Sequence, residues 1–96
     1  MRFHLYGAGR HTARLLMDRS LWEARGHQLV GLIDDHPRFQ KHAEAYGLPV
    51  INCAAAAGLP AGTVVVLSTD AFEEQFWQNT VPLRAQGHAI LRLYNS

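Results

Sequence analysis

The chain has 96 residues, 48% of them hydrophobic, and carries a formal net charge of +1 at pH 7. This length predicts one domain spanning residues 1–96, and the hydrophobic content is enough for a core and excludes an intrinsically disordered chain. The near-neutral charge gives no general electrostatic attraction to nucleic acid or to an anionic membrane surface, so neither is expected as a partner.

Cys53 is the only cysteine in the chain, so no internal disulfide can form and a reducing compartment fits best. No apolar run approaches the ~20 residues that a membrane-spanning helix needs. The N-terminus lacks the charged, apolar and cleavage regions of a signal peptide. We therefore expect a soluble cytoplasmic protein.

The first third of the chain predicts a strand, a helix and a second strand. Residues 2–6 and residues 28–34 have the apolar patterns of strands. Between them, residues 10–25 carry apolar side chains at helical spacing, and Gly26 is suited to end this helix. The expected inward stripe of the helix consists of Ala13, Leu16, Met17, Ser20, Leu21 and Ala24.

The middle of the chain predicts shorter elements. Asp35 is suited to cap a helix over residues 35–46. Residues 49–52 predict a short third strand, and residues 53–57 predict one helical turn. Residues 63–68 are the clearest strand, because their central side chains are apolar on both faces, as in a strand covered on both sides.

The last third of the chain predicts a helix and a final strand. Asp70 is suited to cap the helix, with Glu73 completing a capping box. Pro82 should kink or split this helix, and residues 88–94 predict the fifth strand. The helical side chains expected to face the core are Phe72, Phe76 and Leu83.

The alternation of strands and helices predicts the fold class. It indicates βαβ units and an α/β fold with a five-stranded parallel sheet. Right-handed crossovers and short connections favour the strand order 3-2-1-4-5, which makes the fold a small Rossmann-like, doubly wound one. No helix follows the fifth strand, so part of one sheet face should be uncovered, as in a homo-oligomer or a protein with a partner domain.

A glycine turn follows the first strand and opens the first helix. Such a turn lets phosphate approach the backbone, and the helix directs its free N–H groups and positive dipole end at that phosphate. Thr12 replaces the third glycine of the usual pattern, at a position where a small residue can serve close packing. Either Arg10 or His11 could approach a phosphate. The expected phosphate-binding residues are Gly7, Ala8, Gly9, Arg10 and His11.

Polar residues at two further strand ends are expected beside this turn. Asp34 ends the second strand at an offset close to the ~20 residues at which an acidic residue binds ribose hydroxyls. Asp35 is adjacent, and Ser68 and Thr69 end the fourth strand at the same crevice. No G-x-S-x-G elbow marks Ser68 as a nucleophile. The pattern predicts a nucleotide site, and the alternative is a glycine turn that holds no ligand.

The remaining metal-binding and aromatic residues form no recognised motif. His36 and His42 are not at the i,i+4 spacing that would place two ligands on one helix face, so no metal site is expected. Cys53 is expected to be a small buried apolar residue. Trp22 and Trp77 are interpreted either as peripheral core or as a partner surface.

The segment YGAGRHTARLL, with GLIDDHPR, GLPVI, STDAFEE and LRLY, resembles a known group of domains. These are the small Rossmann-like domains of sugar-nucleotide and polysaccharide-biosynthesis enzymes, including the N-terminal domain of bacterial sugar O-acyltransferases and epimerase/dehydratase-like proteins. The resemblance implies a nucleoside-diphosphate-sugar pocket, or a pyrophosphate site in dinucleotide-binding members. By position, the residues it implies are Gly7, Gly9, His11, Asp34 and Asp35.

The sequence predicts a binding module rather than an enzyme that acts alone. It shows neither the left-handed β-helix that carries catalysis in the acyltransferases nor a Tyr-x-x-x-Lys pair, so no catalytic residue is predicted. The expected ligand is NAD(H) or a nucleoside-diphosphate sugar, bound within a larger biosynthetic system. The alternatives are a small oxidoreductase or epimerase completed by dimerisation, and an interaction scaffold without a ligand.

Overall fold

The computed structural model describes residues 1–36 and 47–94. Five strands form one sheet, in which every neighbouring pair is parallel and the order is β3-β2-β1-β4-β5. The predicted α/β class and strand order 3-2-1-4-5 are therefore confirmed. The strands are β1 (Arg2–Tyr6), β2 (Gln28–Ile33), β3 (Val50–Ile51), β4 (Val64–Leu67) and β5 (Ala89–Arg92).

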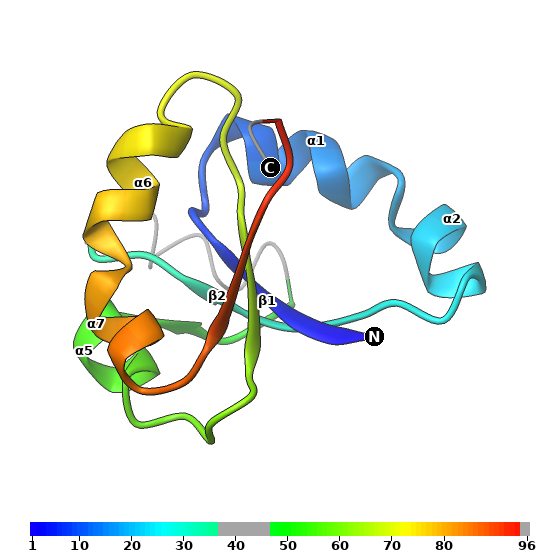
Figure 1. Ribbon diagram of the computed structural model, residues 1–96. Coiled ribbons are helices and arrows are strands. Elements are labelled where there is room, and N and C mark those ends of the chain that lie inside the picture. The colour runs from blue at the N-terminus through cyan, green and yellow to red at the C-terminus, as the bar shows by residue number, and fades with distance from the viewer. Residues whose placement is uncertain (37–46, 95–96) are drawn as a thin grey trace.

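Helices cover both faces of this sheet (Figure 1). On one face lie α1 (Arg10–Met17) and α2 (Arg19–Ala24). On the other lie α5 (Cys53–Ala56), α6 (Glu73–Asn79) and α7 (Val81–Ala85). The single helical turn predicted after the third strand is confirmed as α5. The helix predicted over residues 35–46 falls on residues 37–46, outside the described part of the chain.

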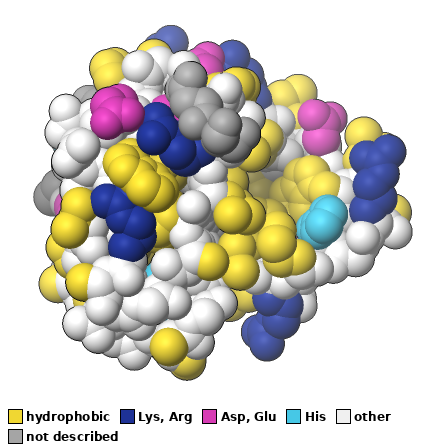
Figure 2. Space-filling model, viewed as in Figure 1, with side chains coloured by type: hydrophobic (Ala, Val, Ile, Leu, Met, Phe, Trp, Pro, Cys, Tyr) yellow, Lys and Arg dark blue, Asp and Glu magenta, His cyan; other side chains and the backbone are white. Residues whose placement is uncertain are grey.

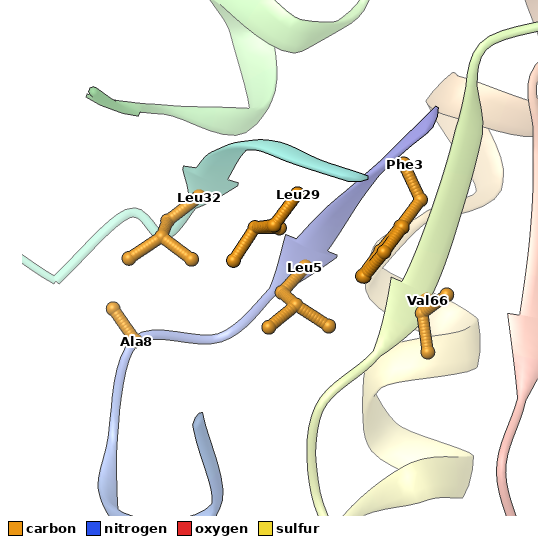
Figure 3. Packing of buried hydrophobic residues seen from close by; sticks show 6 residues of the cluster. All are labelled: Phe3, Leu5, Ala8, Leu29, Leu32 and Val66. Atoms are coloured by element: carbon orange, nitrogen blue, oxygen red, sulfur yellow. The ribbon is translucent and has the colours of Figure 1, made fainter. Parts of the chain in front are cut away.

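Each face of the sheet has its own hydrophobic cluster. Between the sheet and α1, the buried members are Phe3, Leu5, Ala8, Leu29, Leu32 and Val66 (Figure 3). On the α6–α7 face they are Tyr6, Ile33, Ala56, Val65, Leu67 and Leu83. Adjacent residues of β4 thus point into different clusters, because successive strand side chains face opposite ways.

The predicted helix over residues 10–25 is broken at Asp18, and its inward stripe is partly wrong. The Asp18 amide donates to the Leu15 carbonyl at 3.1 Å, and the same carbonyl accepts from the indole N–H of Trp22, also at 3.1 Å. The break lets the Trp22 ring pack edge-on against Phe3, with ring centroids 5.5 Å apart. Four stripe members are left on the surface, namely Met17, Ser20, Leu21 and Ala24. The exposed fractions of Met17 and Leu21 are 82% and 61%.

The predicted split at Pro82 is confirmed, since α6 ends at Asn79 and α7 begins at Val81 with Pro82 in its first turn. Phe76 and Leu83 face the core as expected. Phe72 does not: it is 64% exposed because it stands before the first turn of α6. Both tryptophans contribute to the periphery of the core, Trp22 beside β1 and Trp77 against the opposite face of the sheet.

One sheet face is left partly uncovered beside β5, as the sequence predicts. Leu91 and Leu93 are 41% and 45% exposed. A hollow of about 190 Å³ lies next to them, lined by Met1, Phe3, Leu5, Leu15, Trp22, His27, Val66 and Leu93. Figure 2 shows hydrophobic side chains gathered there, between β5 and the α1–α2 pair. Within residues 1–36 and 47–94, no helix has the length and apolar character to span a membrane.

Candidate functional site

The turn after β1 is held between two neighbouring strands. Its Gly7 amide donates to the Ile33 carbonyl of β2 at 2.8 Å. Gly7 has φ +113°, and a Cβ there would lie 3.0 Å from the Ser68 carbonyl oxygen and 3.1 Å from the Phe76 ring. Glycine is therefore required at this position by the backbone itself, whether or not a ligand approaches it.

The rest of the turn positions the start of α1. The Ala8 side chain is fully buried and points toward Leu32 (Figure 3). Gly9 is the N-cap residue, and the first intrahelical bond runs from the Ala13 amide to the Gly9 carbonyl at 3.1 Å. The amides before Ala13 lie at the positive end of the helix, and no acidic side chain occupies the first turn of α1.

The two carboxylates after β2 are placed differently. Asp34 accepts from the Ala8 amide at 2.9 Å and from the His36 amide at 2.7 Å, so its carboxylate is hydrogen-bonded to the glycine turn itself. One oxygen of Asp35 accepts from the Cys53 amide at 2.7 Å, which ties the end of β2 to the start of α5. Across the described residues, no hydrogen bond uses the second oxygen of Asp35. Asp35 is also exposed, so it is the more accessible of the two carboxylates.

A chain of polar contacts connects α1, β4 and the residues after β5. The Thr12 hydroxyl donates to the Gly7 carbonyl at 2.6 Å and lies 2.6 Å from the Ser68 hydroxyl. Ser68 Oγ is 2.9 Å from His11 Nδ1, and His11 Nε2 is 2.7 Å from the Tyr94 hydroxyl. The side chains of Thr12 and Ser68 are buried.

The partners of each group determine which one donates and which one accepts at every contact of this polar chain. Thr12 has one hydroxyl proton and gives it to a carbonyl, so Ser68 must donate to Thr12. Ser68 then accepts from the Nδ1–H of His11. Burial lowers the pKa of His11, which favours the neutral imidazole, and its Nε2 accordingly accepts from Tyr94. The Ser68 proton is thus committed to Thr12 and is not oriented for nucleophilic attack.

Among the described residues, no side chain caps the start of α6, whose N-cap residue is Phe72, and Thr69 shapes the turn that precedes the helix. Thr69 Oγ1 accepts from the Ala71 amide at 3.3 Å and from the Phe72 amide at 3.0 Å. The predicted capping box of Asp70 and Glu73 is therefore wrong. Asp70 instead pairs with Arg14 at 3.3 Å on the surface.

Glu73 has a structural role that the sequence interpretation missed. Its side chain is 1% exposed, and one oxygen accepts from the amides of Leu93 and Tyr94 at 3.0 and 2.9 Å. Its other oxygen lies 3.3 Å from Arg92 Nε. A signal for its burial exists in the sequence, because Glu73 shares a helical face with the core residues Phe76 and Trp77. Tyr94 is the other missed residue, and no local pattern marks it.

An open cleft of about 410 Å³ lies at the carboxyl ends of β1 and β2. Burial raises the pKa of Tyr6, in its wall, to about 12, with smaller contributions from Cys53 and Asp35. The Tyr6 hydroxyl therefore stays protonated near neutral pH. The lining residues are Tyr6, Gly7, Asp34, Asp35, His36, Phe76 and Asn79.

The predicted site residues are thus distributed over three places. Gly7, Asp34 and Asp35 line the cleft. His11 and Ser68 belong to the polar chain. Ala8 and Gly9 shape the glycine turn, and Thr69 shapes the turn before α6. Arg10 lies beside a separate surface hollow with Ala13 and Arg14.

The titratable residues in the described ranges form no cluster of three metal ligands. His36 lines the cleft, His42 lies outside those ranges, and Cys53 is half-buried. The chain matches no protein-family model, no curated protein and no solved structure. The resemblance to sugar-nucleotide domains therefore stays a prediction, and the function is argued from the geometry alone.

Proposed function

We propose that this domain binds a nucleotide, either NAD(H) or a nucleoside-diphosphate sugar, in the cleft at the carboxyl ends of β1 and β2. The observation that carries the proposal is a cleft lined by Gly7 of the glycine turn and by the accessible carboxylate of Asp35, beside the turn that leads into the N-terminus of α1. In doubly wound sheets, ligands bind beyond the carboxyl ends of the strands, at the point where the strand order reverses. That point lies between β1 and β4, and the cleft occupies its β1–β2 side.

Each part of a nucleotide has a complementary group at this edge. The N-terminus of α1 offers backbone N–H groups to phosphate, with the exposed Arg10 as a nearby cation. The second oxygen of Asp35 is suited to accept from a ribose hydroxyl, because its first oxygen is occupied by Cys53. The aromatic side chains of Tyr6 and Phe76 supply an apolar wall.

The domain is proposed to be a non-catalytic module of a larger sugar or polysaccharide biosynthesis system. The committed protons of the Ser68–His11 pair support this, since they leave no activated nucleophile there. The exposed apolar surface at Leu91 and Leu93 supports association with another subunit or domain.

A thermal-shift titration with NAD⁺, NADH and UDP-glucose tests the proposal. A ligand at a hundred times its Kd stabilises a folded domain by about 2.7 kcal/mol, which for this size is a rise of roughly 10–20 °C in Tm. Asp35→Asn keeps an oxygen for the Cys53 amide but loses the charge, so it should weaken binding about 10–100-fold. Asp70→Asn is the matched control outside the cleft and should bind as the wild type does.

Gly9→Val provides a second probe of the phosphate position. The φ of Gly9 is −91°, a value open to any residue, so the variant adds bulk at the turn without left-handed backbone strain. It should abolish the ligand-induced shift. If none of the three ligands raises Tm, the nucleotide proposal is wrong.

A second candidate is an interaction scaffold without a ligand. The observation that favours it is the bond between Asp34 and the Ala8 amide, which uses the acidic residue inside the fold. This candidate predicts no thermal shift with any nucleotide but a stable oligomer in sedimentation, formed through the uncovered face beside β5.

A further inference from the structure

The side chains of His11 and Tyr94 lie across the carboxyl end of β4. His11 belongs to the first turn of α1, and Tyr94 follows the end of β5. Their rings meet edge to face with centroids 5.7 Å apart, and the imidazole also contacts Ser68 at the end of β4 at 2.9 Å. Figure 1 shows the red segment that follows β5 beside the start of α1.

A buried carboxylate holds Tyr94 in this place. Glu73 accepts from the backbone amides of both Leu93 and Tyr94, and Arg92 pairs with the same carboxylate. Hydrogen bonds to a charged acceptor are stronger than those between neutral groups. These hydrogen bonds therefore hold the backbone of Tyr94 in place, although the residue is 56% exposed.

The cleft proposed for the nucleotide lies on the other side of the glycine turn. Its lining comes from the ends of β1 and β2 and from α6, and none of its described lining residues belongs to β5 or follows it. A dinucleotide placed across such a sheet occupies both halves of the crevice, one nucleoside on each side of the point where the strand order reverses. The second half is the place that His11 and Tyr94 cross.

We propose that Tyr94 is a specificity-determining residue that limits the site to ligands with one nucleoside and its phosphates, and excludes the second nucleoside of a dinucleotide. This inference rests on the proposed nucleotide-binding function. Among the two ligand classes considered above, it favours nucleoside-diphosphate sugars over NAD(H). The contact between Tyr94 and His11 keeps the tyrosine ring over β4, and removing the ring opens that half of the crevice.

The test compares ligands that share a base. Dissociation constants are measured by titration calorimetry for ADP against NAD⁺, and for UDP against diuridine diphosphate. The wild type should bind the diphosphate at least about tenfold more tightly than the dinucleotide with the same base. Tyr94→Ala should bring the two constants within about threefold by strengthening dinucleotide binding, and should leave the diphosphate constant unchanged.

Two further variants control this experiment. Phe72→Ala removes another exposed aromatic ring and should leave the preference as in the wild type. Tyr94→Phe keeps the ring but loses the hydrogen bond to His11, so it should relax the preference only in part. It also supplies a conservative variant if the alanine protein folds poorly.

The outcomes separate this inference from the nucleotide proposal. A wild type that binds NAD⁺ as tightly as ADP overturns the role of Tyr94 and leaves nucleotide binding standing. A preference that persists unchanged in both Tyr94 variants overturns that role as well. If the wild type binds none of the four ligands, both proposals fail together.

Discussion

Replacement of Thr12 by valine removes one hydroxyl from the buried polar chain and changes little else. Valine has nearly the same shape and helix propensity as threonine, so packing within α1 is retained. The Gly7 carbonyl loses its donor and the Ser68 hydroxyl loses its acceptor, because Thr12 donates to the first and accepts from the second, while Ser68 keeps its contact with His11. Thr12 is 0% exposed, so water does not replace it.

The size of the effect follows from these two lost hydrogen bonds. Each buried donor or acceptor left unsatisfied costs about 1–3 kcal/mol, so Thr12→Val should destabilise the domain by about 2–6 kcal/mol. Thr12→Ser keeps the hydroxyl and loses only a methyl group, at a cost of about 1 kcal/mol. The isosteric variant should therefore be the less stable of the two.

Urea unfolding followed by circular dichroism measures both variants, with unchanged m-values as the sign of an intact fold. A double-mutant cycle with Ser68→Ala should give a coupling energy of at least about 0.5 kcal/mol, because the two hydroxyls share a bond. The reasoning is refuted if Thr12→Val lies within about 0.5 kcal/mol of the wild type, or if Thr12→Ser is the more damaging change.

Three further predictions concern Gly7, His11 and Tyr6. Gly7→Ala should lower the free energy of unfolding, measured in urea, by roughly 2–4 kcal/mol, whereas Gly26→Ala should lower it by about 1 kcal/mol. Both glycines have positive φ, but only a Cβ at Gly7 would meet neighbouring atoms, at 3.0 and 3.1 Å, so equal losses would contradict the packing argument. Burial lowers the pKa of His11 from 6.5, so below about pH 6.5 the unfolded chain binds more protons than the folded one and the domain should become less stable as the pH falls. This loss of stability should be smaller in His11→Gln. If the pH profile of that variant is unchanged, His11 does not cause the loss. Burial raises the pKa of Tyr6 to about 12, so ultraviolet titration should show one phenol that ionises well above the usual value of 10. The stability of the domain should decline as the pH rises past 10, because the phenol ionises more readily in the unfolded chain. The high-pH ionisation should be absent in Tyr6→Phe, and its persistence there would assign it to another tyrosine.

The strand order could be predicted because alternating strands and helices with right-handed crossovers leave few arrangements. The apolar run at Val64–Leu67 marked a strand covered on both faces, and β4 is such a strand, with residues in both clusters. The glycine turn and Asp34 were predicted at the ends of adjacent strands. The structure joins them directly, through the bond from the Ala8 amide to Asp34.

The start of α6 could not be predicted from Asp70, because the helix begins at Glu73 with Phe72 as its N-cap residue and no side-chain cap among the described residues. Thr69 Oγ1 accepts from the amides of Ala71 and Phe72 and so shapes the turn before the helix. The Glu73 carboxylate is turned inward, where it accepts from the amides of Leu93 and Tyr94. These amides lie 20 and 21 positions after Glu73, so a short stretch of sequence around the helix start does not contain them.

The contact between His11 and Tyr94 was also beyond local reasoning. The two residues are separated by 83 positions and meet only because β5 pairs with β4 and ends beside α1. The break at Asp18 has a similar origin, since the packing of Trp22 against Phe3 decides it rather than helix propensity. Features that depended on chain topology were predictable, and features that depended on individual side chains meeting across the fold were not.

The placement of the two tryptophans gives each layer of the domain its own optical reporter. Trp22 and Trp77 are the only tryptophans in the chain, and they pack on opposite faces of the sheet. The Trp77 ring also lies 3.6 Å from the guanidinium carbon of Arg84, so the two indoles emit from different electrostatic surroundings. In the Trp77→Phe protein, tryptophan fluorescence would report only on the α1–α2 layer, because Trp22 alone remains. In the Trp22→Phe protein, it would report only on the α6–α7 layer.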